Sequence, residues 1–295
     1  MKIYLFFSFI FCTVLTNQGC DDTVKKSTPT DHGPFGEYWY QGKGEVNTYF
    51  LEQERYKEIR KGEAVMVFVT EDFSMKKQVK SDYPEQAGAD KVTVMKNNAL
   101  RRFQTGIYDY SLMESVFTPV DITHFPHSLK ADASIQDWCG QVFTQLNLKG
   151  SGYEVNSYSY FEKEGDQHFR TENALLEDEL FNLIRINPEK LPVGEVTILP
   201  SLFYTRLHHQ PLKPQSAKLT IEDIGLQRVC ILRYSSMNRT LKITFQKDFP
   251  HRINAWEEDN GDGFITRAKL NKSIQTAYWE KNSHQYDSWR DTLGL

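Results

Sequence analysis

The sequence alternates apolar and polar side chains at period two over much of its length. The pattern is clear in residues 76–80 (KKQVK), 91–96 (KVTVMK) and 239–245 (RTLKITF). Because successive side chains of a strand point to opposite faces of a sheet, these segments predict strands with one buried and one solvated face. We therefore expect a mainly β (α+β) chain with large antiparallel sheets, either curved or sandwiched.

Two pairs of neighbouring segments predict β-hairpins. Residues 138–148 and 153–161 flank a Lys-Gly-Ser-Gly turn, and residues 226–234 and 239–245 flank a second polar turn. Residues 64–69 (AVMVFV) are instead continuously apolar, which predicts a strand buried on both faces.

One central segment has the signals of a helix. Leu176, Leu180 and Leu183 recur at helical spacing, the acidic residues 177–179 suit a helix N-terminus, and Asn187-Pro188 ends the pattern. We expect this helix to pack across an open sheet face. A weaker helical pattern follows a strand within residues 51–63. Regular alternation of strands and helices is absent, which argues against a Rossmann-type or TIM-barrel enzyme.

The N-terminal residues have the layout of a signal peptide. Lys2 precedes an apolar run over residues 3–15, and the small residue Gly19 precedes Cys20. This run is shorter than the roughly 20 apolar residues that a membrane-spanning helix needs. We therefore expect residues 1–19 to be removed during secretion.

Gly19-Cys20 is similar to the end of a bacterial lipobox, in which the cysteine is acylated and becomes the new N-terminus. Asn17 and Gln18 depart from the usual aliphatic and small residues, as in the looser boxes of Bacteroidetes-like lipoproteins. The alternative is a secreted protein with Cys20 in a disulfide. Since two acyl chains give stable anchoring, a lipidated Cys20 predicts a lipoprotein of the cell envelope that is anchored to the outer membrane. The sequence does not decide whether the protein lies on the periplasmic side or on the cell surface.

The remaining chain divides into a tether and a folded part. Residues 20–36 are polar, contain proline and glycine, and have no apolar periodicity, so they predict a flexible tether. Residues 37–295 predict a β-rich domain, or two sub-domains that meet near residues 170–190. Within this part lie Cys139 and Cys230, which either form a disulfide in the oxidising envelope or stay free as small apolar residues.

Motifs for cofactors, metals and nucleic acid are missing. The chain has no P-loop, dinucleotide fingerprint or HExxH sequence, and its net charge of −4 argues against a nucleic-acid partner. The acidic turn at residues 259–263 puts Lys269 at the twelfth position of a calcium loop, where a bidentate carboxylate is required. We therefore predict no metal and no cofactor.

Two functional hypotheses remain from the residues alone. Trp39, Tyr108, Tyr110, Trp138, Tyr158 and Tyr160 are candidates to line a ligand groove on a curved sheet, although cross-strand packing uses the same residue types. This favours a non-enzymatic envelope module that binds an apolar ligand or another envelope protein. The alternative is an envelope hydrolase that uses His124, His127 or His208 as its general base.

Several phrases resemble a lipoprotein family of flavobacteria and other Bacteroidetes. They are residues 38–43 (YWYQGK), 51–74, 103–119 and 138–141 (WCGQ). Members are often labelled septum formation inhibitor Maf, which implies nucleotide pyrophosphatase activity. True Maf proteins are cytoplasmic α/β enzymes with an early Ser-Pro-Arg-Arg motif, which this chain lacks. The resemblance assigns no catalytic residue. The later half of the chain, where a helix precedes strands that end in residues 239–258, is also similar to periplasmic proteins whose curved antiparallel sheets hold apolar ligands.

Acylation of Cys20 would add the mass of its acyl groups to the N-terminal peptide and would place the protein in the membrane fraction. We expect mass spectrometry of the mature N-terminal peptide to show an acylated Cys20 and the protein to fractionate with membranes. A Cys20→Ser variant should appear in the soluble fraction. An unmodified Cys20 thiol in the membrane-free wild-type protein would contradict lipidation.

Overall fold

The alternating segments join one sheet in the computed structural model, which describes residues 33–295. This confirms the predicted mainly β, antiparallel fold with few helices. The signal peptide, Cys20 and tether residues 20–32 lie outside the described residues. Residues 33–36, which we assigned to the tether, instead begin a short helix.

The strands, in chain order, are β1 (Gly44–Glu54), β2 (Ile59–Ser74), β3 (Val79–Lys80), β4 (Lys91–Thr105), β5 (Tyr108–Pro119), β6 (Lys130–Asp137), β7 (Gly140–Lys149), β8 (Gly152–Ser159), β9 (Gln167–Glu172), β10 (Leu175–Leu176), β11 (Gly194–Leu199), β12 (Gln215–Ile224), β13 (Gln227–Tyr234), β14 (Thr240–Gln246), β15 (Ile253–Asp259) and β16 (Ile265–Thr276). The α-helices are α1 (Gly33–Trp39), α2 (Leu180–Ile186), α3 (Leu202–Leu207) and α4 (Trp289–Leu293).

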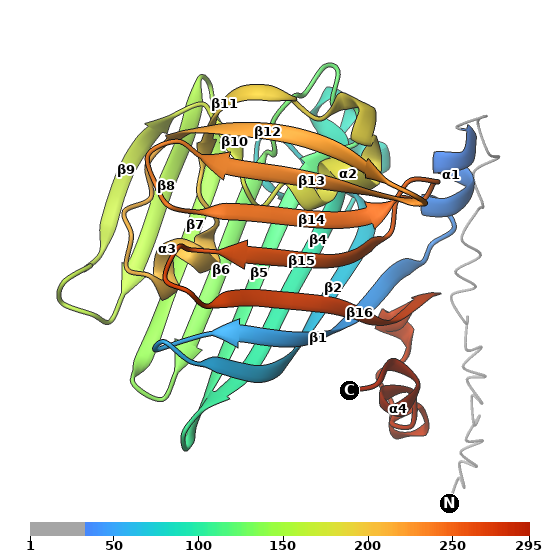
Figure 1. The fold of residues 1–295 in the computed structure, drawn as a ribbon. Coiled ribbons are helices and arrows are strands. Elements are labelled where there is room, and N and C mark those ends of the chain that lie inside the picture. The colour runs from blue at the N-terminus through green and yellow to red at the C-terminus, as the bar shows by residue number, and fades with distance from the viewer. Residues whose placement is uncertain (1–32) are drawn as a thin grey trace, which may run out of the picture. The chain divides into compact units, whose positions relative to one another are not determined.

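The sheet runs continuously from β10 to β9. Its order is β10-β11-β12-β13-β14-β15-β16-β1-β2-β4-β5-β6-β7-β8-β9, with β3 paired to β2. Among the pairs, β10 and β11 are parallel and the others are antiparallel. In Figure 1 the strands β11–β16 and β1 cross in front of β4–β8, so the sheet turns back on itself.

Both predicted hairpins are confirmed, since β7 pairs with β8 and β13 pairs with β14. Residues 64–69 are the mostly buried centre of β2. Two expectations were wrong. Residues 76–80 form only the two-residue strand β3, because the chain turns at residues 75–78. Residues 51–63 contain no helix: β1 and β2 meet there in a tight turn in which Tyr56 and Lys57 both have φ of 59°.

The two helices α2 and α3 fill the space between the two halves of the sheet, and we call them the inner helices. The central helix predicted near residues 171–187 is α2, and α3 was not predicted. All six residues of α3 and its neighbour Ser201 are buried, as are six of the seven residues of α2. Without these helices the apolar face of the sheet would be open to water.

Helix α2 contacts both halves of the sheet. On one side, the amide Nδ2 of Asn182 donates hydrogen bonds to the backbone oxygens of Met95 and Val116, both at 3.1 Å. On the other side, the ring of Phe181 packs edge-on against Trp256 of β15, with 5.9 Å between centroids. Helix α2 therefore holds the two halves together.

A buried ion pair joins α2 to β1. The guanidinium of Arg185 donates to both carboxylate oxygens of Glu45 at 2.6 and 2.7 Å, and neither side chain is more than 1% exposed. Burial alone would raise the pKa of Glu45, but the Arg185 guanidinium and the hydroxyl of Tyr38 outweigh it and lower the pKa to about 2. Glu45 is therefore a carboxylate inside the core, and Arg185 is its counter-ion.

Breaking this pair should strongly destabilise the protein. Glu45→Gln leaves a buried guanidinium without its charge partner, so we expect a loss of about 3–5 kcal/mol in the free energy of unfolding, measured by urea denaturation. The double variant Glu45→Leu/Arg185→Met should lose less than the single variant. Because Glu45 titrates near 2 in the fold against an ordinary 4.5, its contribution should be complete above pH 4.5 and fall as pH drops toward 2.

Glu63→Gln is the matched control, because Glu63 forms an exposed pair with Arg102 at 3.4 Å. Its loss should stay below about 1 kcal/mol. Equal effects of Glu45→Gln and Glu63→Gln would contradict the proposed importance of the buried pair.

Candidate functional site

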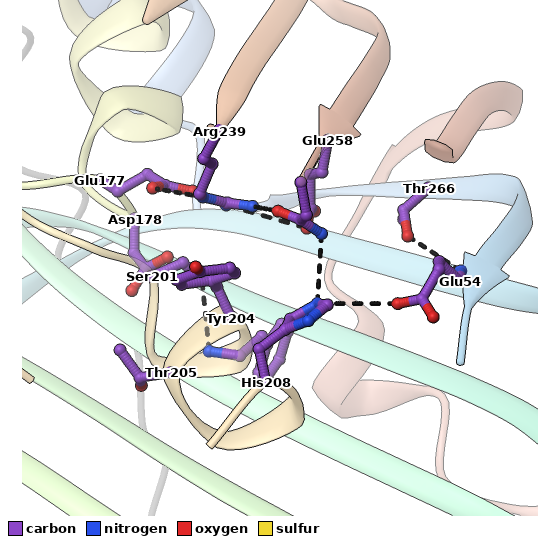
Figure 2. Close-up of polar contacts among 12 residues, drawn as sticks. Glu54, Glu177, Asp178, Ser201, Tyr204, Thr205, His208, Arg239, Glu258 and Thr266 are labelled. Atoms are coloured by element: carbon purple, nitrogen blue, oxygen red, sulfur yellow. Dashed lines mark hydrogen bonds and ion pairs between the residues drawn. The ribbon is translucent and has the colours of Figure 1, made fainter. Parts of the chain in front are cut away.

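A second buried charge cluster lies where the inner helices meet β14 and β15 (Figure 2). Arg239, just before β14, pairs with the carboxylate of Glu177 and lies 3.9 Å from that of Glu258 on β15. All three side chains are at least nine-tenths buried. The pKa of Glu258 is lowered, because the guanidinium groups of Arg101 and Arg239 outweigh the effect of burial. We call this set the Arg239 cluster.

The cluster extends across the sheet through Arg101 of β4. Arg101 donates to Glu258 at 2.6 Å and to Gln53 at 3.2 Å. Gln53 in turn donates to the hydroxyl of Thr266 at 3.0 Å, and the same hydroxyl accepts from the backbone N–H of Glu54 at 2.9 Å. The charges and polar groups here satisfy one another, so this part of the cluster is a cross-link within the fold.

Glu114 of β5 is the exception. One oxygen of its carboxyl is buried without a hydrogen-bond partner. Burial raises the pKa of Glu114 well above its ordinary range, and the neighbouring carboxylate of Asp178 raises it further. Asp178 already accepts a hydrogen bond from the backbone N–H of Leu202, the first residue of α3, at 3.0 Å. Burial and the Asp178 carboxylate therefore both favour the protonated form of Glu114.

His208 is the histidine nearest to this cluster. Its Nε2 lies 3.7 Å from the carboxylate of Glu54 and 3.1 Å from the amide nitrogen of Asn260. Its ring stacks on Tyr204 with 4.9 Å between centroids. Burial lowers the pKa of His208, and Arg239 lowers it further, so both effects favour the neutral imidazole. The Asn260 amide occupies the Nε2 lone pair that a general base would use.

The hydroxyls of Ser201 and Thr205, which Figure 2 labels, are also engaged in hydrogen bonds. Ser201 Oγ accepts from the backbone N–H of Phe203 at 3.1 Å, where it caps α3. Thr205 Oγ1 donates to the backbone oxygen of Leu202 at 3.1 Å. Neither hydroxyl donates to His208, so the described residues contain no serine–histidine or threonine–histidine pair at this position.

The other two candidate histidines lie elsewhere. His124 is an exposed loop residue whose Nδ1 pairs with Asp121 at 2.7 Å. His127 is half-buried at the end of the same loop, and burial lowers its pKa. No contact joins either of them to His208, so the three candidate general bases do not converge.

The six aromatic residues predicted to line a groove occupy different environments. Trp39 and Tyr110 are buried in the core, whereas Trp138, Tyr158 and Tyr160 are 68%, 55% and 75% exposed. Tyr108 lies between these groups, with its ring centroid 5.8 Å from Tyr110 and 6.5 Å from Trp138. The structure therefore brings Tyr108, Tyr110 and Trp138 together, but not all six.

The two remaining cysteines are free thiols. Cys139 is exposed in the turn between β6 and β7, and Cys230 is buried within β13. Burial raises the pKa of Cys230 to about 12. Cys230 therefore behaves as a small core residue rather than as a nucleophile.

A mostly apolar cavity lies under the loop between β5 and β6, and we call it the His127 groove. Its volume is about 400 Å³. The lining residues are Ile122, Thr123, Pro126, His127, Asn173, Ala174, Leu175, Leu183, Lys190, Pro192, Val196 and Thr197. They come from five separate stretches of chain, and no sequence motif indicated that they meet. His127 was noted only as a possible base.

A larger depression of about 620 Å³ lies beside β1, β2, β4 and β5. Its lining includes the charged side chains of Lys61, Glu63, Arg102 and Asp109, which make it a less selective site for an apolar molecule.

Within residues 33–295, no three His, Cys, Asp or Glu side chains converge to hold a metal ion. No helix in that range is long and apolar enough to cross a membrane.

No protein-family model matches the chain, and no curated protein or solved structure matches it significantly. The resemblance to flavobacterial lipoproteins therefore stays a prediction from the sequence.

The Glu114–Asp178 pair predicts how stability depends on pH. Because the pKa of Glu114 is raised in the fold, its contribution is full below the ordinary value and is lost as pH rises. We expect Glu114→Gln, which keeps a donor toward Asp178, to be more stable than wild type in urea at about pH 8 and equal to it at about pH 4.5. Glu195→Gln, at an exposed position of β11, should show no such difference. A variant that is less stable than wild type at both pH values would contradict the raised pKa of Glu114.

Proposed function

We propose that the protein is a non-enzymatic binding module of the bacterial cell envelope, anchored through acylated Cys20, which takes up a small apolar ligand. The observation that carries this proposal is the His127 groove. Its volume of about 400 Å³ lies within the roughly 300–1,000 Å³ of small-molecule sites. Seven of its twelve lining residues are apolar, and the polar ones are Thr123, His127, Asn173, Lys190 and Thr197.

The walls of the groove are fixed before any ligand arrives. Ala174, Leu175 and Leu183 are buried members of the main core, so they cannot move apart without disturbing the inner helices. The loop above them is also tied down, because the backbone N–H of Ser128 donates to the carboxylate of Glu179 at 2.6 Å. A preformed apolar site loses little conformational entropy on binding.

His127 contributes a hydrogen-bonding group to the lining of the groove. Its Nδ1 is buried and has no hydrogen-bond partner, and burial lowers its pKa. Since His127 lines the groove, its imidazole can pair with one hydroxyl or carbonyl of a ligand. The preferred ligand is therefore an uncharged, mostly apolar molecule with a single polar group.

The hydrolase alternative has less support. Of its candidate bases, His208 has its Nε2 occupied by Asn260, and His124 pairs with Asp121 on open surface. A nucleotide pyrophosphatase, the activity suggested by the family label, is also not favoured. Its expected α/β fold differs from this antiparallel sheet.

Binding to the His127 groove can be measured with N-phenyl-1-naphthylamine, an uncharged apolar fluorophore. We expect saturable fluorescence enhancement with the wild-type protein. Val196→Trp should weaken binding about tenfold or more, equivalent to about 1.4 kcal/mol, because the larger side chain fills the groove. Val196 is half-buried at the groove wall on β11.

Ile224→Trp is the matched control, since Ile224 is exposed on β12 and does not line the groove. This variant should bind the fluorophore as tightly as wild type. The proposal fails if the wild-type protein gives no saturable enhancement, or if Val196→Trp and Ile224→Trp bind equally well.

A further inference from the structure

A second cavity lies beside α3, and we call it the Arg206 pocket. Its volume is about 230 Å³. The side chains of β7, β8 and β9 form one wall, and the chain from Thr205 to Leu212 forms the opposite wall. It shares no lining residue with the His127 groove.

Arg206 is a buried cation in this pocket with an incomplete set of partners. Its side chain is only 8% exposed. The guanidinium lies over the ring of Phe161, with 4.4 Å from Cζ to the centroid, and Nε is buried without a hydrogen-bond partner. A buried guanidinium normally has its donors paired, and an unpaired one is costly. Nη1 lies 3.3 Å from Nδ1 of His209 and 3.5 Å from Glu164, whereas Nη2 has no hydrogen-bond partner among the described residues and is the donor left for a ligand.

The neighbouring carboxylate does not satisfy this charge. Glu164 approaches Arg206 at 3.5 Å, which is long for a charged hydrogen bond. The closer partners of Glu164 are His209, at 2.6 Å from Oε1, and the hydroxyl of Ser159, at 3.0 Å from Oε2. Glu164 is the only acidic residue lining the pocket, and Lys163 adds a second cation there. The local balance is therefore positive.

The remaining walls are apolar with a few hydroxyl groups. Val142, Val155 and Leu212 line the pocket, and Thr144 and Ser157 bond to each other through their hydroxyls at 2.8 Å. Because those hydroxyls already pair, they do not compensate the guanidinium. An anion that also carries an apolar body would match both the charge and the walls.

We propose that the Arg206 pocket binds a small monocarboxylate with a short apolar body, whose carboxylate pairs with the Arg206 guanidinium. A cavity of about 150 Å³ accommodates benzene, so 230 Å³ has room for one ring or a short aliphatic chain together with a carboxylate. The planar guanidinium matches a carboxylate through two parallel hydrogen bonds. This site is independent of the proposed function of the His127 groove.

Benzoate and hexanoate are suitable probes, with benzamide and hexanol as their neutral counterparts. We expect saturable binding of both carboxylates to the full-length protein by isothermal titration calorimetry or saturation-transfer NMR. The affinity of the neutral counterparts should be lower by about tenfold or more, because they lack the charge that pairs with the guanidinium.

Three variants and one control locate the site. Arg206→Gln should reduce carboxylate affinity about tenfold or more, whereas Arg267→Gln, at an exposed arginine paired with Glu257 at 3.2 Å, should leave it unchanged. Leu212→Trp should also abolish binding by filling the pocket, and it leaves Arg206 in place if Arg206→Gln does not fold. Glu164→Gln should strengthen binding severalfold, because it removes the competing negative charge.

Two results would overturn the proposal. One is the absence of saturable carboxylate binding to the wild-type protein up to about 10 mM. The other is binding that Leu212→Trp leaves unchanged, since a carboxylate bound in the Arg206 pocket could not tolerate the larger side chain.

Discussion

The fold depends on buried pairing between guanidinium and carboxylate groups where the inner helices meet the sheet. A sheet that turns back on itself leaves a wide apolar face, and α2 and α3 cover it from within. These helices bring Arg185 and the neighbouring Glu177 into the interior, and the sheet supplies Glu45 and Arg239 as their partners. Each charge would be costly alone, so the pairs require the helices to sit in one position. The ion pairs therefore contribute more to specifying the arrangement than to net stability.

Filling the interior also decides where ligands can bind. The space between the sheet halves is taken by the inner helices, and the Arg239 cluster is closed by contacts among its own members. Open volume remains at the margins, and it includes the two cavities proposed to bind ligands, the His127 groove beside α2 and the Arg206 pocket beside α3. The two cavities differ in chemistry, since one holds a neutral imidazole in apolar walls and the other an incompletely paired guanidinium. This difference is the physical basis for proposing two classes of ligand.

Local patterns in the sequence were sufficient for the strands at residues 64–69 and 91–96, both hairpins and α2, because side-chain alternation and turn chemistry act over a few residues. The hairpin turn at Tyr56 and Lys57 was missed because both residues adopt positive φ without a glycine. Helix α3 is too short to show periodicity. The pair between Glu45 and Arg185 joins residues 140 positions apart, and the groove joins five stretches of chain. Such contacts arise only from the tertiary fold, so no local pattern predicts them.

The central claim is that the inner helices are part of the cooperative core and not a removable lid. Hydrogen exchange of the backbone amides of Leu183 and Asn187, which close α2 through bonds to Glu179 and Leu183 at 2.9 Å, tests this most directly when followed over increasing urea. We predict that these amides exchange only through global unfolding, with the same free energy and urea dependence as amides in β4 and β5. Exchange of α2 at a lower free energy, with little dependence on urea, would contradict the account.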